Sequence, residues 1–516
     1  MRKATSKQSH PPSPFLCKCT HMKHVLHILA LMHHPTKISF HITTLSSLAK
    51  LAHVCISFTS FLVFAFLDLL DQVLCPVFAF LDRLMDENTA APCYCHQVPS
   101  LSDHQMQQQL DKKKKEKKII GDGRVLQTKL VIDTEANIVS EYVSDAFVSK
   151  LEKLEDLTGV TLSRKESDCS GMSGAVTVPK NCVVGAKSSI IPARKARWSD
   201  CACSTCSSCP TNGEDLLHVQ VVGTRDFDRA DNNVIFIHGF LSSSSFWTDT
   251  VLPQLPETIR ASYRLFAVDL LGFGKSPKPT NCLYTHADHI DMLRRSVIER
   301  YGIRKFHVVA HSMGCTVALA LAGYEPSAVQ SVTLISPPYF LATSGTLPAE
   351  YTMQQVAPKK VWPLVAFGAS VMSWYEHLGR AVCLVICKHH HFWEPLAAFV
   401  SNHLLGLRQV LQKPFFHDFM QHTHHSAWHI FHNTFCPSAY AIQIFMRILQ
   451  EQGQRVRIIH GDSDSICPIQ CSMDLSQCYS NVVLSVIPGA GHLTVVVGRE
   501  HDLATELTQE ILRAHN

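Results

Sequence analysis

A serine between small residues is the candidate nucleophile of this chain. Ser312 lies in the run Ala310-His-Ser-Met-Gly314, between an apolar stretch typical of a strand and an alanine- and leucine-rich stretch typical of a helix. A sharp strand-to-helix turn of this kind exposes a serine hydroxyl, and it needs small flanking residues because the strained backbone passes close to its neighbours. Ala310 stands where glycine is commoner, and serine is also an ordinary helix N-cap. The assignment therefore depends on partners elsewhere in the chain.

A carboxylate and a histidine follow the serine in the order of a Ser-Asp-His triad. A serine hydroxyl is a weak nucleophile until a histidine removes its proton and an acid orients that histidine. We expect a strand over 456–459 to lead into a loop that carries Asp464, and a later strand beginning at Val482 to end in a glycine-rich turn that presents His492. Ser312, Asp464 and His492 are therefore the predicted catalytic residues.

Two other aspartates compete with Asp464 for the role of the acid. Asp462 lies in the same loop, where its ordinary role is to form the turn. Asp269 follows an expected strand over 265–268, but it precedes the serine in the chain, and we expect it to hold its own loop. We prefer Asp464 because the orienting carboxylate is expected a few residues past the end of its strand, in the Gly-Asp-x-Asp-x-x-x-Pro pattern of residues 461–468.

Two backbone N–H groups are expected to stabilise a negatively charged oxygen. An expected buried strand over 234–237 runs into His238-Gly-Phe240, which makes the N–H of Phe240 one donor. Met313 directly follows the nucleophile and supplies the second donor. Removing one such donor typically costs about 10²–10³ in rate. We expect His311, beside the nucleophile, to line or support the site.

The elements that position these residues predict an α/β-hydrolase fold, a mostly parallel central sheet with helices on both faces. Together, the ordered motifs resemble those of the α/β-hydrolase superfamily over roughly residues 215 to 510. We divide this part into a core at 215–336 and 453–516 and an inserted helical cap at 337–452. The apolar and aromatic content of the cap suits a cleft for a fatty acyl chain. The same pattern would arise from helix faces that pack onto the core, and some of them must do so.

Short motifs in the second half resemble those of the plant BODYGUARD proteins. They are Phe246-Trp247, residues 267–279, residues 356–363, residues 366–370, Trp374-Tyr-Glu-His377, residues 422–429 and residues 495–499. The resemblance implies a plant epidermal protein needed for cuticle formation and a probable lysophospholipase or esterase acting around cutin. It also implies a secretory, plasma-membrane or extracellular location in the epidermal cell wall.

We therefore expect a serine esterase or lysophospholipase whose substrate is a fatty-acyl ester or a lysophospholipid. An acyltransferase or polyester synthase could use the same triad, because the two activities differ only in which nucleophile reaches the acyl-enzyme. A receptor or scaffold that binds a ligand without turnover is the alternative from another class. No nucleic-acid partner is expected, and the sequence identifies no protein partner.

The amino-terminal part predicts association with a membrane. Residues 1–67 contain no Asp or Glu, and Leu51 to Leu67 carries no formal charge. A helix needs about 20 apolar residues to cross a bilayer, which the apolar pattern reaches only when it is extended through 51–81. A signal anchor, an amphipathic or hairpin-like association and a soluble core helix remain open. We assign residues 1–46 to a basic, poorly ordered leader and residues 47–85 to the hydrophobic segment.

Residues 86–214 read as a linker with a lysine run and a cysteine-rich stretch. We expect Lys112 to Lys118 to be a solvated charge run. The cluster Cys201, Cys203, Cys206 and Cys209 could form disulfides, remain as thiols or bind zinc. We expect the histidines of 389–391 and 422–432 to lie on the surface or pack within the cap, because no carboxylate lies among them at ligand spacing. A metal site remains the alternative, since His425 and His429 would share one face of a helix. No cofactor and no metal is expected.

Overall fold

The computed structural model describes residues 38–85, 198–201, 203, 216–223, 231–280, 282–341, 348–403 and 418–513. The predictions made for residues 1–37, the lysine run, Cys206 and Cys209 lie outside these residues.

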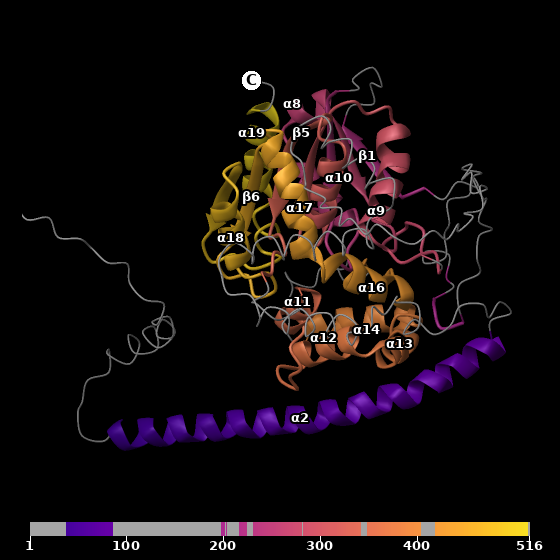
Figure 1. The fold of residues 1–516 in the computed structure, drawn as a ribbon, viewed down its shortest axis with the longest axis vertical. Helices are drawn as coiled ribbons and strands as arrows, with labels where there is room; N and C mark the ends of the chain where they lie inside the picture. The colour runs from indigo at the N-terminus through magenta and orange to yellow at the C-terminus, as the bar shows by residue number, and fades with distance from the viewer. Residues whose placement is uncertain are drawn as a thin grey trace, which may run out of the picture. The chain divides into compact units, whose positions relative to one another are not determined.

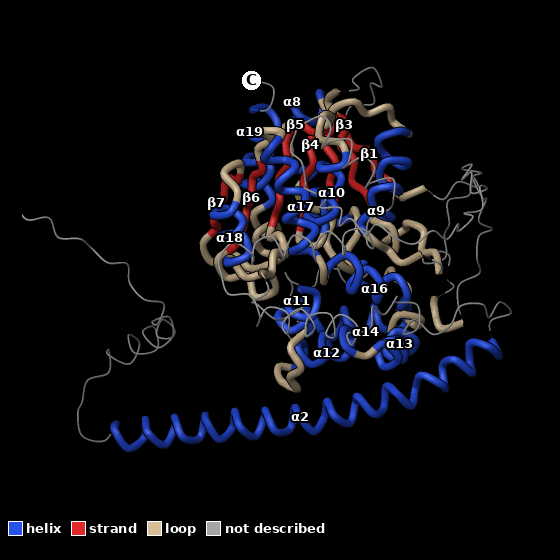
Figure 2. The backbone as a smooth tube through the Cα atoms, in the orientation of Figure 1, coloured by secondary structure: helices blue, strands red, loops and turns tan. Residues whose placement is uncertain are grey.

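A seven-stranded sheet forms the centre of the core (Figure 2). Its strand order is β1-β3-β2-β4-β5-β6-β7. Within this sheet of the described residues, β1 pairs with β3 in antiparallel orientation, and the other neighbouring strands pair in parallel. The predicted α/β-hydrolase fold class is thus confirmed. The strands are β1 (Val219–Gly223), β2 (Asn233–Ile237), β3 (Arg264–Val268), β4 (Phe306–His311), β5 (Val329–Ile335), β6 (Val456–Gly461) and β7 (Val482–Ile487).

Helices cover both faces of the sheet because its strands are apolar on both sides. In β2, Ile235 and Ile237 join one buried cluster, whereas Val234 and Phe236 join the other, as the alternation of side chains in a strand requires. The first cluster contains residues of α9 (His286–Leu293), η3 (Arg294–Glu299), α10 (Gly314–Tyr324), α17 (Ser438–Glu451) and α18 (Gln470–Cys478). The second contains residues of α7 (Ser245–Thr248), η2 (Leu252–Gln254), α8 (Glu257–Ser262) and α19 (Glu500–Arg513).

The cap follows β5 and consists of helices gathered at one end of the sheet (Figure 1). They are α11 (Pro348–Val356), α12 (Leu364–Trp374), α13 (Glu376–Val385), α14 (His390–His403), α16 (His424–Ile430) and η4 (Phe431–Phe435).

Helix α17 lies within the interval that we predicted as cap, yet it packs on α10 of the core. A Cβ atom added to Gly323 of α10 would lie 2.6 Å from Cδ1 of Phe445 on α17, so the two helices touch closely. Ile442 and Leu449 of α17 are fully buried in the core cluster. The cap therefore ends before Ser438. The sequence did not reveal this boundary, because the apolar face of a helix can pack on the cap or on the core.

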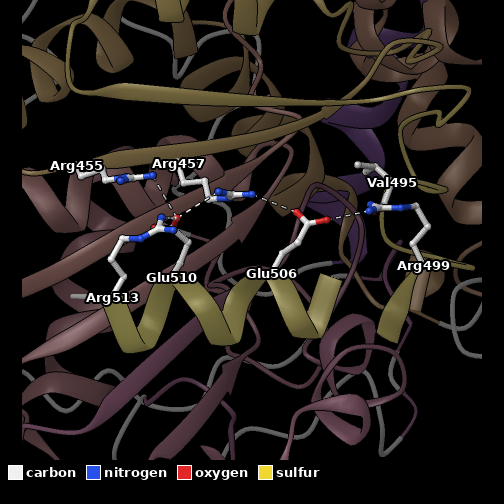
Figure 3. Close-up of polar contacts among 7 residues, drawn as sticks. All are labelled: Arg455, Arg457, Val495, Arg499, Glu506, Glu510 and Arg513. Atoms are coloured by element: carbon white, nitrogen blue, oxygen red, sulfur yellow. Dashed lines mark hydrogen bonds and ion pairs between the residues drawn. The ribbon is translucent and has the colours of Figure 1, made fainter. Parts of the chain in front are cut away.

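Ion pairs fix the C-terminal helix α19 to the sheet (Figure 3). Glu510 is 4% exposed, and its Oε1 lies 3.2 Å from Nη1 of Arg457 on β6. Glu506, one turn earlier on α19, pairs with Arg457 on β6 and with Arg499 just before α19. Four arginines surround the two glutamates, namely Arg455, Arg457, Arg499 and Arg513.

Helix α2 (Ile38–Met85) begins before the predicted hydrophobic segment, within the residues that we assigned to a leader. Residues 38–46 contain neither a charge nor a proline, and Pro35 is the last helix-breaking residue before them. The predicted boundary between leader and hydrophobic segment therefore lies inside one continuous helix. The stretch Cys55–Met85 is long and apolar enough to cross a membrane by length and composition.

From Phe64 onward, α2 contacts the cap through its acidic residues. Asp71 Oδ2 lies 3.0 Å from His377 Nδ1, and Asp82 Oδ2 accepts a hydrogen bond of 2.8 Å from Arg380 Nη1. Asp68 accepts a hydrogen bond from the hydroxyl of Tyr375 at 2.6 Å. Large apolar side chains of the same segment remain exposed, namely Phe66, Leu69, Val73, Phe80 and Leu84. This half of the helix therefore has an acidic side bound to the cap and an apolar side without cover among the described residues.

Candidate active site

Ser312 occupies a strained turn between β4 and α10. Its φ is +54°, a left-handed conformation that residues other than glycine rarely adopt. The turn is close-packed, because a Cβ atom on Gly314 would lie 2.3 Å from the carbonyl oxygen of His238. Buried Ala310 fits the other small-residue position. Backbone strain retained at a single residue is typical of functional sites, where the surrounding structure enforces it.

The structure brings Ser312, His492 and Asp464 together from three separate segments. The Oγ atom of Ser312 lies 2.9 Å from Nε2 of His492. The Nδ1 atom of the same ring lies 2.7 Å from Oδ2 of Asp464. One imidazole therefore links a hydroxyl to a carboxylate, an arrangement that allows the hydroxyl to lose its proton to the ring.

The carboxylate of Asp464 is held by the loop after β6. Its Oδ1 accepts hydrogen bonds from the backbone N–H groups of Ile466 and Cys467, both at 2.9 Å. Burial alone would raise its pKa, but the hydrogen bonds from His460 and His492 outweigh burial and hold the pKa of Asp464 well below its usual value. The group is therefore ionised at neutral pH and can orient His492.

The competing aspartates hold turns. Asp462 Oδ1 accepts a hydrogen bond of 2.7 Å from the N–H of Gly489. Asp269 accepts hydrogen bonds from the N–H groups of Ser244 and Lys275, at 2.6 and 2.8 Å. Both therefore have the loop-forming contacts expected of them.

Two further histidines support the triad geometry. His311 Nε2 donates a hydrogen bond of 2.9 Å to the carbonyl oxygen of His492, and its ring stacks on Phe246 with centroids 4.9 Å apart. Burial lowers the pKa of His311 to about 3, so the ring is neutral. His460 Nε2 lies 3.4 Å from Oδ2 of Asp464. We did not predict His460 from the sequence, where its place at the end of a strand was the only signal.

The expected oxyanion donors lie on two turns beside the serine. A Cβ atom on Gly239 would lie 3.1 Å from Cβ of Ser312, so the chain leading to Phe240 passes directly by the nucleophile. The turn is held by His238, whose Nε2 accepts a hydrogen bond of 2.9 Å from the N–H of Leu270. Met313 follows Ser312 and is fully buried. Gly239, which precedes Phe240, and Met313, which follows Ser312, thus both lie beside the Ser312 side chain.

An aromatic group flanks this site. The ring of Phe240 packs edge-to-face on Phe273 with centroids 5.5 Å apart, and it lies 5.7 Å from the ring of Phe431 in the cap. Phe435 continues the group, with its centroid 6.4 Å from that of Phe240. The predicted oxyanion turn is therefore bordered by apolar rings from both the core and the cap.

Comparison with known proteins identifies the family. The model of the alpha/beta hydrolase fold family matches residues 232–498. Over 473 residues the chain is 38% identical to "Probable lysophospholipase BODYGUARD 2" of Arabidopsis thaliana, an alignment that covers 87% of this chain and 95% of that protein. The chain belongs to the BODYGUARD family. It is also 36% identical to "Probable lysophospholipase BODYGUARD 1" of the same plant, over 86% of this chain and 94% of that protein.

This BODYGUARD protein is therefore a hydrolase of the α/β-hydrolase fold, and the predicted resemblance is confirmed. Among solved structures, a haloalkane dehalogenase variant from Bradyrhizobium elkanii is 16% identical, with a TM-score of 0.42 over 58% of this chain and 93% of that one.

Proposed function

We propose that this protein is a serine carboxylic-ester hydrolase that works through an acyl-enzyme. The observation that carries the proposal is the continuous set of hydrogen bonds from Ser312 through His492 to Asp464 at a strained turn. Dehalogenase and epoxide-hydrolase relatives place an aspartate at this turn, whereas this chain has a serine there.

The reaction follows from these contacts. His492 accepts the hydroxyl proton while Ser312 Oγ bonds to the ester carbonyl carbon, and the carbonyl oxygen becomes an oxyanion that the N–H groups of Phe240 and Met313 stabilise. The C–O bond to the alcohol then breaks, and the leaving alcohol takes the proton from His492. In the second half of the reaction, His492 takes a proton from water while the water oxygen bonds to the acyl carbon. The bond from that carbon to Ser312 Oγ then breaks, Oγ takes the proton from His492, and the carboxylic acid is released. Asp464 stabilises the imidazolium that forms in each half.

A fatty-acyl ester, such as a lysophospholipid, is the proposed substrate. The aromatic rings beside Phe240 offer apolar surface where an acyl chain would lie. The names of the two Arabidopsis relatives point to the same class of lipid. A role around cutin in the epidermal cell wall, reached through the secretory pathway, completes the proposal and rests on family membership.

We propose that the part of α2 from Phe64 to Met85 associates with the membrane surface and lies along it. Asp68, Asp71 and Asp82 contact the cap, so the helix presents its apolar side outward while its acids stay bound to protein. An isolated acidic residue at the centre of a bilayer costs about 2.5–3.5 kcal/mol or more, which disfavours a simple span through this half of the helix. Such a position would bring the cap close to lipid substrates.

Labelling with a fluorophosphonate tests the mechanism. The wild-type protein should be labelled, and Ser312→Ala should lose both labelling and turnover of lysophospholipids and hydroxy-acyl glycerols. Ser476→Ala, which alters a half-buried serine on α18, is the matched control and should behave as wild type. Product analysis separates hydrolysis from transfer to a hydroxy-acyl acceptor. A folded wild-type protein that is neither labelled nor active would reject the triad and favour a receptor or scaffold.

A further inference from the structure

Two cysteines and a histidine meet inside the cap. Cys383 lies on α13, Cys387 follows one helical turn later, and His422 lies just before α16. Their exposed fractions are 3%, 9% and 6% respectively, so all three are buried. From the sequence we expected no metal, because no carboxylate accompanies the histidines. In the structure, the thiols of Cys383 and Cys387 accompany His422 in place of a carboxylate.

The distances among the three side chains match those of a tetrahedral zinc site. Nε2 of His422 lies 3.8 Å from Sγ of Cys383 and 3.8 Å from Sγ of Cys387. All three candidate ligand atoms lie within 4.8 Å of one another. Zinc bonds of about 2.3 Å to sulfur and about 2.0 Å to nitrogen separate these atoms by about 3.6 Å at a tetrahedral angle. Little movement would therefore bring them into coordination.

The ring of His422 is oriented as a metal ligand. Its Nδ1 donates a hydrogen bond of 2.9 Å to the carbonyl oxygen of Phe419, which leaves the Nε2 lone pair facing the two sulfurs. A carbonyl or carboxylate on the far nitrogen is the usual support of a zinc-bound histidine. By contrast, Nε2 of His425 lies 2.9 Å from the carbonyl oxygen of Cys282, as expected of a histidine that only packs.

We propose that Cys383, Cys387 and His422 bind a zinc ion that fixes the cap. The two thiols would release their protons on binding, and two thiolates with a neutral imidazole would cancel the charge of Zn²⁺. A neutral group is the form that a buried position tolerates best. The fourth position falls to water, which keeps the group neutral.

The ion would connect the cap to the predicted oxyanion turn. His422 pairs with Phe273 of the core through an isolated antiparallel bridge. Phe273 in turn packs against the ring of Phe240. Removal of the metal should therefore loosen the cap and disturb the site around Ser312.

A second group of similar composition is a useful comparison. His390 Nε2 lies 3.4 Å from Sγ of Cys203, and Cys201 completes this group. The proposal rests on the first group, because residues next to Cys203 lie outside the described part of the chain.

Elemental analysis of the purified full-length protein tests the proposal. The wild type should hold zinc, and Cys383→Ser and His422→Gln should each lose about one equivalent. Cys478→Ser, which removes an exposed cysteine, is the matched control and should retain the full amount. Cys203→Ser distinguishes the two groups, because it should leave the equivalent assigned to Cys383 in place.

Measurements on the wild type keep the test decisive if a variant does not fold. Zinc X-ray absorption should show sulfur and nitrogen ligands together, and cobalt substitution should give thiolate charge-transfer absorption. Chelation should lower the melting temperature and slow fluorophosphonate labelling. A wild type that takes up neither metal, a disulfide between Cys383 and Cys387, or full zinc retention by folded Cys383→Ser would overturn the proposal.

Discussion

The hydrolase core and the cap hold their buried polar groups in different ways. In the core, the candidate reactive residues sit at the ends of strands, and loop N–H groups hold Asp464. In the cap, His377 and Arg380 depend on Asp71 and Asp82, which lie about three hundred positions earlier in the chain. The core is thus organised by its sheet, whereas the cap requires partners that no local pattern supplies.

The largest expected effect separates two aspartates of one core loop. Asp464→Asn should lower kcat/KM by roughly 10³–10⁴, because an amide cannot hold His492 in the required tautomer. Asp462→Asn, the matched control, should change kcat/KM by less than about tenfold, since Asp462 holds a turn. Ester hydrolysis by both variants provides the measurement. Equal losses in the two would break the assignment of the acid.

The cap should respond strongly to loss of a distant acid. Asp82→Asn removes the carboxylate that pairs with the guanidinium of Arg380, a side chain that is 2% exposed. Removing one partner of a buried ion pair typically costs about 3–5 kcal/mol. Hydrogen exchange should accelerate in α13 and remain slow in α10. Asp291→Asn, which alters an exposed pair on α9, is the control. Unchanged exchange in α13 would show that the cap is stable without α2.

Acid should weaken the core through its neutral histidines. Burial lowers the pKa of His289 and of His311 from 6.5 to about 3. Below pH 6.5 these histidines bind protons in the unfolded chain but stay neutral in the folded chain. The free energy of unfolding should therefore fall by up to about 1.4 kcal/mol per pH unit for each of the two histidines. This stability is complete above pH 6.5 and is lost progressively toward pH 3.

Denaturant unfolding at several pH values gives the measurement. His289→Leu should reduce the pH dependence by about one proton. His501→Gln, an exposed change on α19, should leave the pH dependence as it is. A slope unaltered by His289→Leu would mean that the buried ring does not control acid stability.

The smallest expected effect concerns the ion pairs of α19. Glu510→Gln should lower the free energy of unfolding by about 1–2 kcal/mol, because Arg457 loses a charged partner. The more exposed Arg455 and Arg513 can be hydrated instead. Glu257→Gln, whose pair with Arg260 is exposed, should cost less than about 0.5 kcal/mol. Thermal unfolding compares the two, and kcat should remain unchanged. A larger loss for Glu257→Gln would reverse the expected order.

Much of the core could be predicted because its signals are local. Apolar runs indicated the strands, and the small residues around Ser312 indicated the turn. The positions of His311 and His460 could not be predicted in detail, because their roles depend on the carbonyl of His492 and on Asp464, which other segments supply. The place of α17 was missed for a similar reason, since its apolar face fits either layer.

The sequence by itself determined the α/β-hydrolase fold, the family and the order of serine, acid and histidine, since strand periodicity and a strained turn are written in neighbouring residues. Only the tertiary structure decided that Asp464 rather than Asp462 contacts His492, that α2 turns its acids toward the cap, and that Cys383, Cys387 and His422 converge. These are contacts between distant segments, and their formation depends on how the layers pack around one another.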